Sequence, residues 1–144
     1  MKVQQLSIFL ENKPGALRAP LDALATAGMD LLTVSLADTA QFGILRFVVR
    51  DPEAARKVLS SAGMVARVTE VVAIEVDNKP GGLAAALGSI EDAGLGVEYM
   101  YLFGTGMQPG KAAIVFRFED PDAAIAALGK TGVKVLTREE LLGR

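Results

Sequence analysis

Two short turns carry the residues of this sequence that are best placed for chemistry. They share the pattern Asn-Lys-Pro-Gly-x-Leu and comprise Asn12, Pro14, Gly15, Ala16 and Leu17 in the first turn, and Asn78, Pro80, Gly81, Gly82 and Leu83 in the second. A turn that opens a helix leaves backbone N–H groups free, and the positive end of the helix dipole strengthens their attraction for a carboxylate. The glycine lets a ligand approach the backbone, and the asparagine amide can accept from an ammonium group or donate to a carboxylate. Both turns are therefore candidate sites for a small ligand.

The same turns also have a purely structural interpretation. Asparagine is a common helix cap and proline fixes φ, so each turn can serve only to start a helix. The second turn has Gly82 where the first has Ala16, so two sites at these turns need not be equivalent. On the residues alone, both interpretations stay open at each turn.

Other kinds of site are poorly represented in the chain. None of its 144 residues is Cys or His, which excludes thiol nucleophiles, disulfides, thiolate metal sites and imidazole bases. Neighbouring carboxylates such as Glu91 and Asp92 are typical of solvated helix faces. The glycines of residues 104–110 before Lys111 suggest a phosphate loop, but the spacing is wrong and Ala112 stands where Ser or Thr is needed. We therefore expect no enzyme, no metal and no cofactor.

Composition and charge narrow the class of protein further. Half of the residues (51%) are hydrophobic, which is enough for a packed core, and the net charge of -2 does not favour nucleic-acid binding. The first 15 residues alternate between apolar and polar types, which predicts a strand rather than a signal peptide. No apolar run approaches the roughly 18 residues that a membrane span needs. We expect a cytoplasmic protein that binds neither nucleic acid nor membrane.

The sequence contains an internal repeat. The first turn recurs 66 residues later, from Asn12 to Asn78, and the segment Asp51-Pro52 recurs 69 residues later as Asp120-Pro121. Two separated motifs repeated in the same order indicate a duplication. The second copy therefore has about three extra residues, which we place in the glycine-rich loop 104–110.

The hydropathy pattern predicts the element order βαββαβ in each copy. The expected strands are 6–10, 31–37, 43–49 and 65–69 in the first copy, and 72–76, 97–103, 112–118 and 133–136 in the second. The second helix of each copy opens with Asp-Pro, a good cap followed by a good first helical residue, and we expect Gly63 and Gly132 to end these helices. Pro20 predicts that the first helix starts late enough to hold this proline in its first turn.

These elements place the chain in the α+β class as two tandem ferredoxin-like modules with side-by-side antiparallel sheets. The expected modules are residues 1–69 and residues 70–144. Residues 68–72 contain no Gly or Pro, so the last strand of the first module should run almost directly into the first strand of the second. Thr137 and Glu140 match a capping box, which predicts a short terminal helix in the second module.

A βαββαβ unit with Asn-x-Pro-Gly-x-Leu between its first strand and first helix resembles the ACT domain. The motif occurs in both modules, so the resemblance covers nearly the whole chain. Residues 42–46 and 98–101 also resemble segments of small stand-alone tandem ACT proteins. The resemblance implies a ferredoxin-like fold that binds amino acids, usually to regulate another protein.

Three aromatic residues alternate along the second strand of the second module, at Tyr99, Tyr101 and Phe103. If Met100 and Leu102 face the helices, these aromatic side chains face away from them. An exposed aromatic patch usually marks an interface. A homodimer is the simpler interpretation, a pocket between modules is the alternative, and both can hold.

We therefore expect an amino-acid-binding regulatory protein that acts through a homodimer. The alternative is a dedicated regulatory subunit of an amino-acid metabolic enzyme, which would then be its partner. An enzyme built on the same fold is least favoured, because the chain lacks His, Cys and a converging acid–base pattern.

Overall fold

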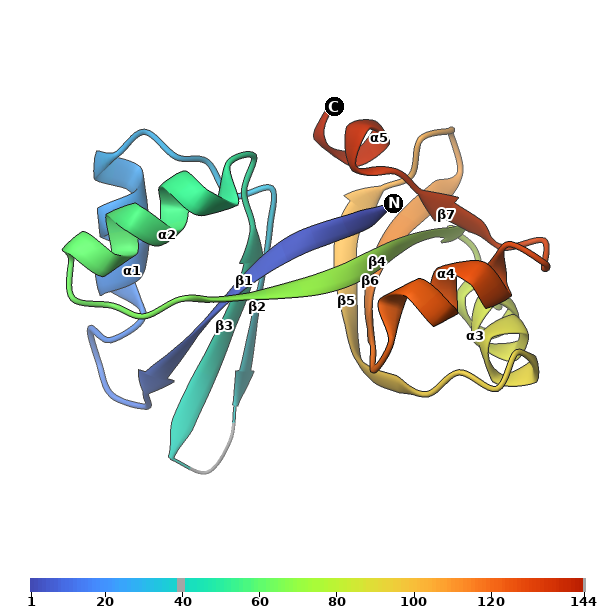
Figure 1. The fold of residues 1–144 in the computed structure, drawn as a ribbon, viewed down its shortest axis with the longest axis horizontal. Helices are drawn as coiled ribbons and strands as arrows, with labels where there is room; N and C mark the ends of the chain where they lie inside the picture. The colour runs from blue at the N-terminus through green and yellow to red at the C-terminus, as the bar shows by residue number, and fades with distance from the viewer. Residues whose placement is uncertain (39–40, 144) are drawn as a thin grey trace. The chain divides into compact units, whose positions relative to one another are not determined.

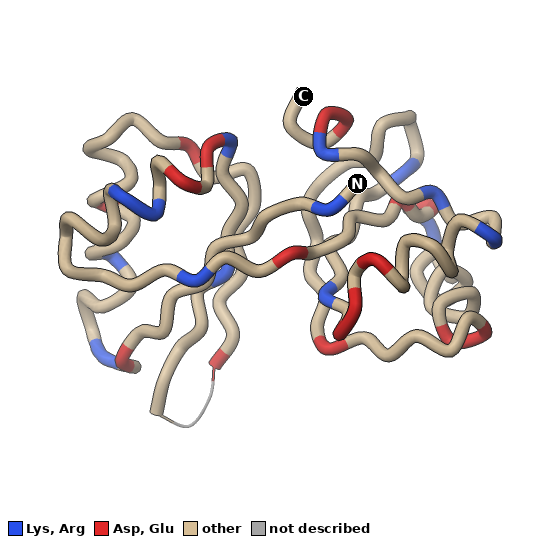
Figure 2. The backbone as a smooth tube through the Cα atoms, in the orientation of Figure 1, with Lys and Arg blue, Asp and Glu red and all other residues tan. Residues whose placement is uncertain are grey.

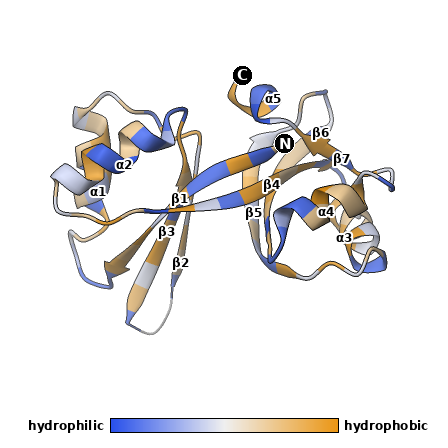
Figure 3. Cartoon of the chain, viewed as in Figure 1, coloured by the Kyte–Doolittle hydropathy of each residue, from blue (hydrophilic) through white to orange (hydrophobic). Residues whose placement is uncertain are grey.

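Strand β1 (Lys2–Glu11) begins the fold, and hydrophilic and hydrophobic residues alternate along much of its length (Figure 3). The computed structural model describes residues 1–38 and 41–143. They divide into two compact units (Figure 1). The first unit is Gln4–Thr69, and the second runs from Glu70 onward and also contains Met1–Val3.

The first unit has two helices packed on one sheet. Its elements are β1, α1 (Arg18–Thr26), β2 (Thr33–Asp38), β3 (Phe42–Val48), α2 (Pro52–Ser61) and the start of β4 (Arg67–Asp77). The strand order is β2-β3-β1-β4, and β3 is antiparallel to both β1 and β2. This is the ferredoxin-like arrangement that the sequence predicts.

The second unit repeats this plan and adds a terminal helix. It contains the rest of β4, α3 (Gly82–Asp92), β5 (Val97–Thr105), β6 (Lys111–Phe118), α4 (Pro121–Leu128), β7 (Lys134–Leu136) and α5 (Arg138–Leu142). The strand order is β5-β6-β4-β7. The capping box predicted for α5 is confirmed: Thr137 Oγ1 accepts from the N–H of Glu140 at 3.1 Å, and Glu140 Oε2 accepts from the N–H of Thr137 at 2.7 Å.

Each unit has its own hydrophobic core between one face of its sheet, here called the helix-covered face, and its first two helices. The buried residues of the first core are Leu6, Ile8, Leu10, Leu24, Leu45, Phe47, Val49, Ala55, Leu59 and Ala66. Those of the second core are Val72, Ile74, Val76, Ala86, Ile90, Ala112, Ile114, Phe116, Phe118, Ala124, Leu128 and Val135. Charged residues of both signs are scattered over each unit (Figure 2), and no helix among the described residues is long and apolar enough to span a membrane.

The chain passes from one unit to the other inside β4, because the boundary between Thr69 and Glu70 falls within that strand. The first three residues of the chain belong to the second unit. There the Nζ of Lys2 lies 3.1 Å from a carboxylate oxygen of Glu70 and 3.1 Å from one of Asp122. Hydrogen bonds to these two carboxylates raise the pKa of Lys2.

Pro20 delays the start of α1, as predicted. The equivalent helix α3 begins at Gly82, but α1 begins at Arg18, two positions further along the repeat, and Pro20 lies in its first turn. Proline has no N–H, so Pro20 cannot donate to the carbonyl of Ala16 and close the earlier helical turn. The preceding hydrogen bond, from the N–H of Ala19 to the carbonyl of Gly15, is correspondingly long at 3.4 Å.

The helices that open with Asp-Pro are capped in the same way in both units. A side-chain oxygen of Asp51 accepts from the N–H of Ala54 at 3.1 Å, and one of Asp120 accepts from the N–H of Ala123 at 3.1 Å. Each bond satisfies one backbone N–H that has no acceptor within its helix. The predicted caps are therefore confirmed.

The predicted end of α4 at Gly132 is wrong. The helix ends at Leu128, with Gly129 as its C-cap. The hydroxyl of Thr131 donates to the carbonyl of Leu128 at 2.7 Å and accepts from the N–H of Val133 at 3.1 Å. This side chain ends the helix by bonding to backbone groups on both sides of the turn, as Ser and Thr often do.

Replacing either capping aspartate should destabilise the protein by a similar amount. We expect Asp51→Ala and Asp120→Ala each to lower the free energy of unfolding by about 1 kcal/mol, because each leaves one helix N–H without its cap. Denaturant unfolding measures the change. The control is Asp30→Ala, at an exposed position, which should stay within about 0.5 kcal/mol of the unaltered protein. Loss of stability at only one of the two capping positions would contradict the equivalence of the caps.

Candidate functional site

A cavity of about 580 Å³ lies at the turn between β1 and α1 of the first unit. Its lining residues are Leu10, Glu11, Asn12, Lys13, Pro14, Gly15, Leu17, Leu36, Ala37, Asp38 and Gly43. They include four of the five residues predicted for this turn. The fifth, Ala16, is half-buried beside them and donates its N–H to the carbonyl of Lys13 at 3.3 Å.

The backbone of this turn is open toward solvent. Gly15 has φ of +87°, in the left-handed region that favours glycine, and a methyl group built on it would meet no other atom within 4 Å. The N–H of Asn12 donates to the carbonyl of Gln41 at 3.3 Å. Among the described residues, no protein acceptor is found for the N–H of Gly15 or of Leu17. These two N–H groups are thus available to a carboxylate at the start of α1.

Polar side chains of the turn and of the adjacent strand ends complete this site. Asn12 Nδ2 donates to Asp38 Oδ1 at 3.3 Å, and Lys13 Nζ lies 3.0 Å from Glu11 Oε2. Sequence reasoning missed Glu11, Lys13 and Asp38. Asp38 lies 26 residues from Asn12 and reaches it only because β3 pairs with both β1 and β2. Asp38 directly follows the strand predicted over residues 31–37, and an acidic residue at that place is the sequence feature that could have indicated it.

Apolar residues line the rest of the cavity. Gly43 pairs with Leu10 on β1 and with Asp38 on β2, so these three residues lie side by side on adjacent strands. A methyl group built on Gly43 would lie 3.2 Å from Cδ1 of Leu36. The absence of a side chain at Gly43 therefore leaves room for Leu36 beside the cavity.

The equivalent turn of the second unit has a similar backbone conformation, but it leaves less space beside the residue that follows its glycine. Gly81 has φ of +85°, and the N–H of Gly82 donates to the carbonyl of Lys79 at 3.0 Å. A methyl group built on Gly82 would lie only 1.9 Å from the carbonyl oxygen of Asp77. Only glycine fits there, whereas the first turn accommodates Ala16. Asn78, Pro80 and Leu83, the other residues predicted for this site, lie on the same turn and the start of α3.

Charged side chains also differ at the second turn. Lys111 Nζ forms a close ion pair with Asp77 Oδ1, and Lys79 Nζ lies 3.8 Å from Asp77 Oδ2. The hydrogen bond from Lys111 holds the pKa of Asp77 below its ordinary value, and the same bond raises the pKa of Lys111. The carboxylate at the end of β4 therefore already has a cationic partner within the chain.

Strand β5 exposes apolar side chains on its helix-covered face. Met100 pairs with Phe116 and Leu102 pairs with Ile114, and both partners belong to the core. Because β5 is the outermost strand, the helices do not cover it fully, and Met100 is 41% and Leu102 60% exposed. The equivalent residues of β2, Val34 and Leu36, are 51% and 53% exposed.

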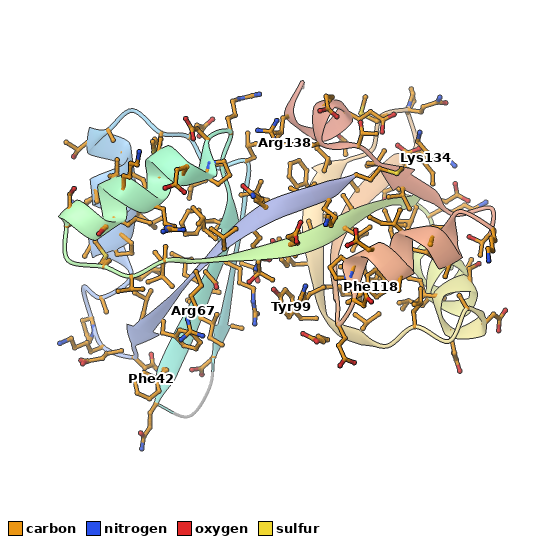
Figure 4. The ribbon with its side chains drawn as sticks, viewed as in Figure 1. Phe42, Arg67, Tyr99, Phe118, Lys134 and Arg138 are labelled. Carbon is orange, nitrogen blue, oxygen red and sulfur yellow. The ribbon has the colours of Figure 1, made fainter. Side chains whose placement is uncertain are left out.

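The three aromatic residues of β5 are half-buried rather than fully exposed. The strand register puts Tyr99 and Tyr101 on the face opposite the helices, where their rings stack with centroids 6.5 Å apart. Figure 4 labels Tyr99 on this strand. Phe103 lies where the register between β5 and β6 shifts. Stacking removes part of each tyrosine ring from solvent, so the larger apolar exposure of β5 is on its other face.

Acidic clusters suited to a metal ion were sought across residues 1–38 and 41–143. No group of three or more Asp or Glu side chains there is placed to hold one. The two turns between a strand and a helix therefore remain the candidate binding sites.

A family model described as an ACT domain pair matches residues 1–142. No curated protein matches the chain significantly. A crystal structure of a protein from Bacteroides thetaiotaomicron is similar at 38% identity and a TM-score of 0.88, covering 98% of this chain and 96% of that one. The ligand-free regulatory subunit of aspartate kinase from Thermus thermophilus shares the fold at 17% identity and a TM-score of 0.60, covering 90% and 91%. The regulatory subunit from Thermus flavus is similar at 16% identity and a TM-score of 0.59, covering 88% and 90%.

Removing Lys111 should change the titration of Asp77. We expect Lys111→Met to raise the pKa of Asp77 toward its ordinary value, because the carboxylate loses its main cationic partner. A depressed pKa adds stability above the unfolded value, and that stability is lost as pH falls through the folded value. In the variant the folded and unfolded pKa values of Asp77 converge, so the stability that the unaltered protein loses through Asp77 as pH falls should be largely absent.

NMR titration of the Asp77 carboxyl carbon measures this pKa directly. Lys130→Met, at an exposed lysine, is the control and should leave the Asp77 titration unchanged. An unchanged Asp77 pKa in Lys111→Met would show that the ion pair does not persist in solution.

Proposed function

The chain belongs to the ACT domain pair family, and we propose that it is a regulatory protein that binds an amino acid at the turn between β1 and α1. It has no catalytic role in this proposal. The observation that carries it is the cavity of about 580 Å³ at that turn, where free backbone N–H groups and Asp38 line the same space.

The polar groups of the cavity suit the two charges of an amino acid. The N–H groups of Gly15 and Leu17 offer donors to the α-carboxylate at the start of α1. Asn12 and Asp38 are joined by a hydrogen bond and offer oxygen acceptors to the α-ammonium group. The strong hydrogen bonds in such a site are those to charged groups.

The apolar lining favours an aliphatic side chain on the ligand. Leu10, Leu17, Leu36 and Ala37 also line the cavity. Contact with them would remove apolar surface from water at about 25 cal/mol per Å². We therefore propose valine, leucine, isoleucine or methionine as the preferred class.

We further propose that the protein acts as a homodimer. Strands β2 and β5 lie at the two ends of the strand order and carry exposed apolar residues, among them Leu36 and Leu102. Edge strands of this kind readily pair with another chain. Leu36 also lines the cavity, so a ligand there would contact a residue of the proposed dimer edge and could shift its packing.

A permanent regulatory subunit of an amino-acid metabolic enzyme is the second candidate function. Two solved structures that share this fold are regulatory subunits of aspartate kinase, and this chain covers about nine-tenths of each. Under this alternative, purification from the native cell would recover an enzyme with the chain in fixed stoichiometry.

A thermal-shift screen of the twenty proteinogenic amino acids tests ligand binding. An aliphatic amino acid at 100 times its dissociation constant should stabilise the protein by about 2.7 kcal/mol, which raises Tm by several degrees. Asn12→Ala should reduce this shift, because it removes a polar group of the site. A melting temperature that none of the twenty amino acids moves would contradict the proposal.

Charged substitutions on the edge strands test the dimer. We expect the unaltered chain to have the mass of two copies by light scattering, and Leu36→Lys or Leu102→Lys to convert it to a monomer, because lysine on an edge strand opposes pairing. The control is Val65→Lys, at a residue that is 80% exposed outside the edge strands. A monomeric unaltered chain would contradict this part of the proposal.

A further inference from the structure

We infer that the two turns are not two copies of one binding site: Asp38 holds the ligand's primary ammonium group in the first unit, and the ammonium group of Lys111 closes the equivalent turn in the second. The inference rests on the proposed function and deepens it. It sets the stoichiometry at one ligand per chain.

Asp38 has the capacity to accept an ammonium group. Its neighbours Glu11 and Lys13 are paired with each other at 3.0 Å, so Asp38 leaves an excess of one negative charge around the first cavity. Asn12 supplies one donor to Asp38, and a carboxylate can accept about four hydrogen bonds. A ligand that keeps its carboxylate at the N–H of Gly15 can place an ammonium group against Asp38.

The second unit lacks a carboxylate at the equivalent place. The register of β5 on β6 shifts between Leu102 and Gly104, so Thr105 pairs with Ala112 where, in the first unit, Asp38 pairs with Gly43. Gly43, whose missing side chain leaves room beside the first cavity, is replaced by Ala112. The second turn therefore has the uncharged hydroxyl of Thr105 in place of the acid, and a methyl group at Ala112 where the first unit has none.

Lys111 forms an ion pair with Asp77, the carboxylate that lies beside the second turn. It pairs with Asp77 across β4 and β6, and its ammonium group bonds to the Asp77 side chain. At the equivalent position of the first unit, Phe42 pairs with Glu11 and provides no charge. Figure 4 shows Phe42 at the start of β3. A ligand would have to displace an ammonium group that is tethered beside Asp77, where its effective concentration is of millimolar order or higher.

The extra loop of the second unit holds Lys111 in place. The N–H of Gly106 donates to the carbonyl of Lys111 at 2.8 Å, and the N–H of Met107 donates to Glu75 Oε2 at 2.6 Å. Gly106 is buried, and a methyl group built on it would lie 2.4 Å from Cβ of Lys111 and 2.8 Å from Glu75 Oε2. The loop is thus packed directly against Lys111.

The close packing of Gly82 against Asp77 is a second, independent observation that the second turn has little space for a ligand. A methyl group there would overlap the Asp77 carbonyl, whereas Ala16 carries its methyl group at the equivalent place. The second turn therefore lies nearer to the end of its strand than the first turn does. The space that a ligand would use is reduced on that side.

Isothermal titration calorimetry on the full chain tests this inference. Valine, leucine, isoleucine and methionine are the first probes, followed by the other proteinogenic amino acids. We expect one ligand per chain, and Asp38→Asn should weaken binding at least tenfold. The corresponding carboxylic acids without the amino group should bind weakly to the unaltered chain and lose little further affinity in Asp38→Asn, because the ammonium contact is already absent.

Gly15→Ala and Gly81→Ala form a matched pair, since both glycines have φ near +86° and open space at Cβ. Both variants should lose similar thermal stability, but only Gly15→Ala should weaken binding by tenfold or more. Two ligands per chain, or equal loss of affinity in the two variants, would overturn the inference and leave the proposed function standing. Failure of every amino acid to bind would overturn both.

Discussion

The position of β3 between β1 and β2 is the constraint on which the candidate site depends. This register brings Leu10, Gly43 and Asp38 together from three strands that are separated in the sequence. A slip of one residue would turn every side chain of a strand to the other face. Leu45 and Phe47 prevent this slip, because both are buried under the helices and would become exposed. The hydrophobic core of the first unit thereby fixes the geometry of a polar site at its edge.

The features predicted correctly from the sequence are those that depend on residues close together in the chain. The conformation of the turns, the caps at Asp51 and Asp120, and the late start of α1 that Pro20 causes all follow from local backbone chemistry. Asp38 and Lys111 were missed because their partners lie 26 and 34 residues away and meet them only through strand pairing. The end of α4 was misplaced because the prediction relied on Gly132. The hydroxyl of Thr131 instead bonds to the backbone of Leu128 and Val133, and the helix ends before it.

The two units show which features a duplicated fold retains. The left-handed glycines of the turns differ by only two degrees in φ, and each turn has the same hydrogen bond from the residue after that glycine. These features determine whether the chain can leave a strand and enter a helix. Side chains beside the turns differ: Asp38 in the first unit corresponds to Thr105 in the second, and Phe42 corresponds to Lys111. Backbone requirements therefore persist while the chemistry at the same place changes.

The sharing of residues between the units has a consequence for biosynthesis. Lys2 precedes its partners Glu70 and Asp122 in the chain and is synthesised before them, although all three belong to the second unit. On the ribosome, the first unit can assemble its core from Leu6 onward while Met1–Val3 still lack their final neighbours. The ion pairs of Lys2 thus form only after Asp122 has been synthesised, so the second unit is completed by residues made before the first unit.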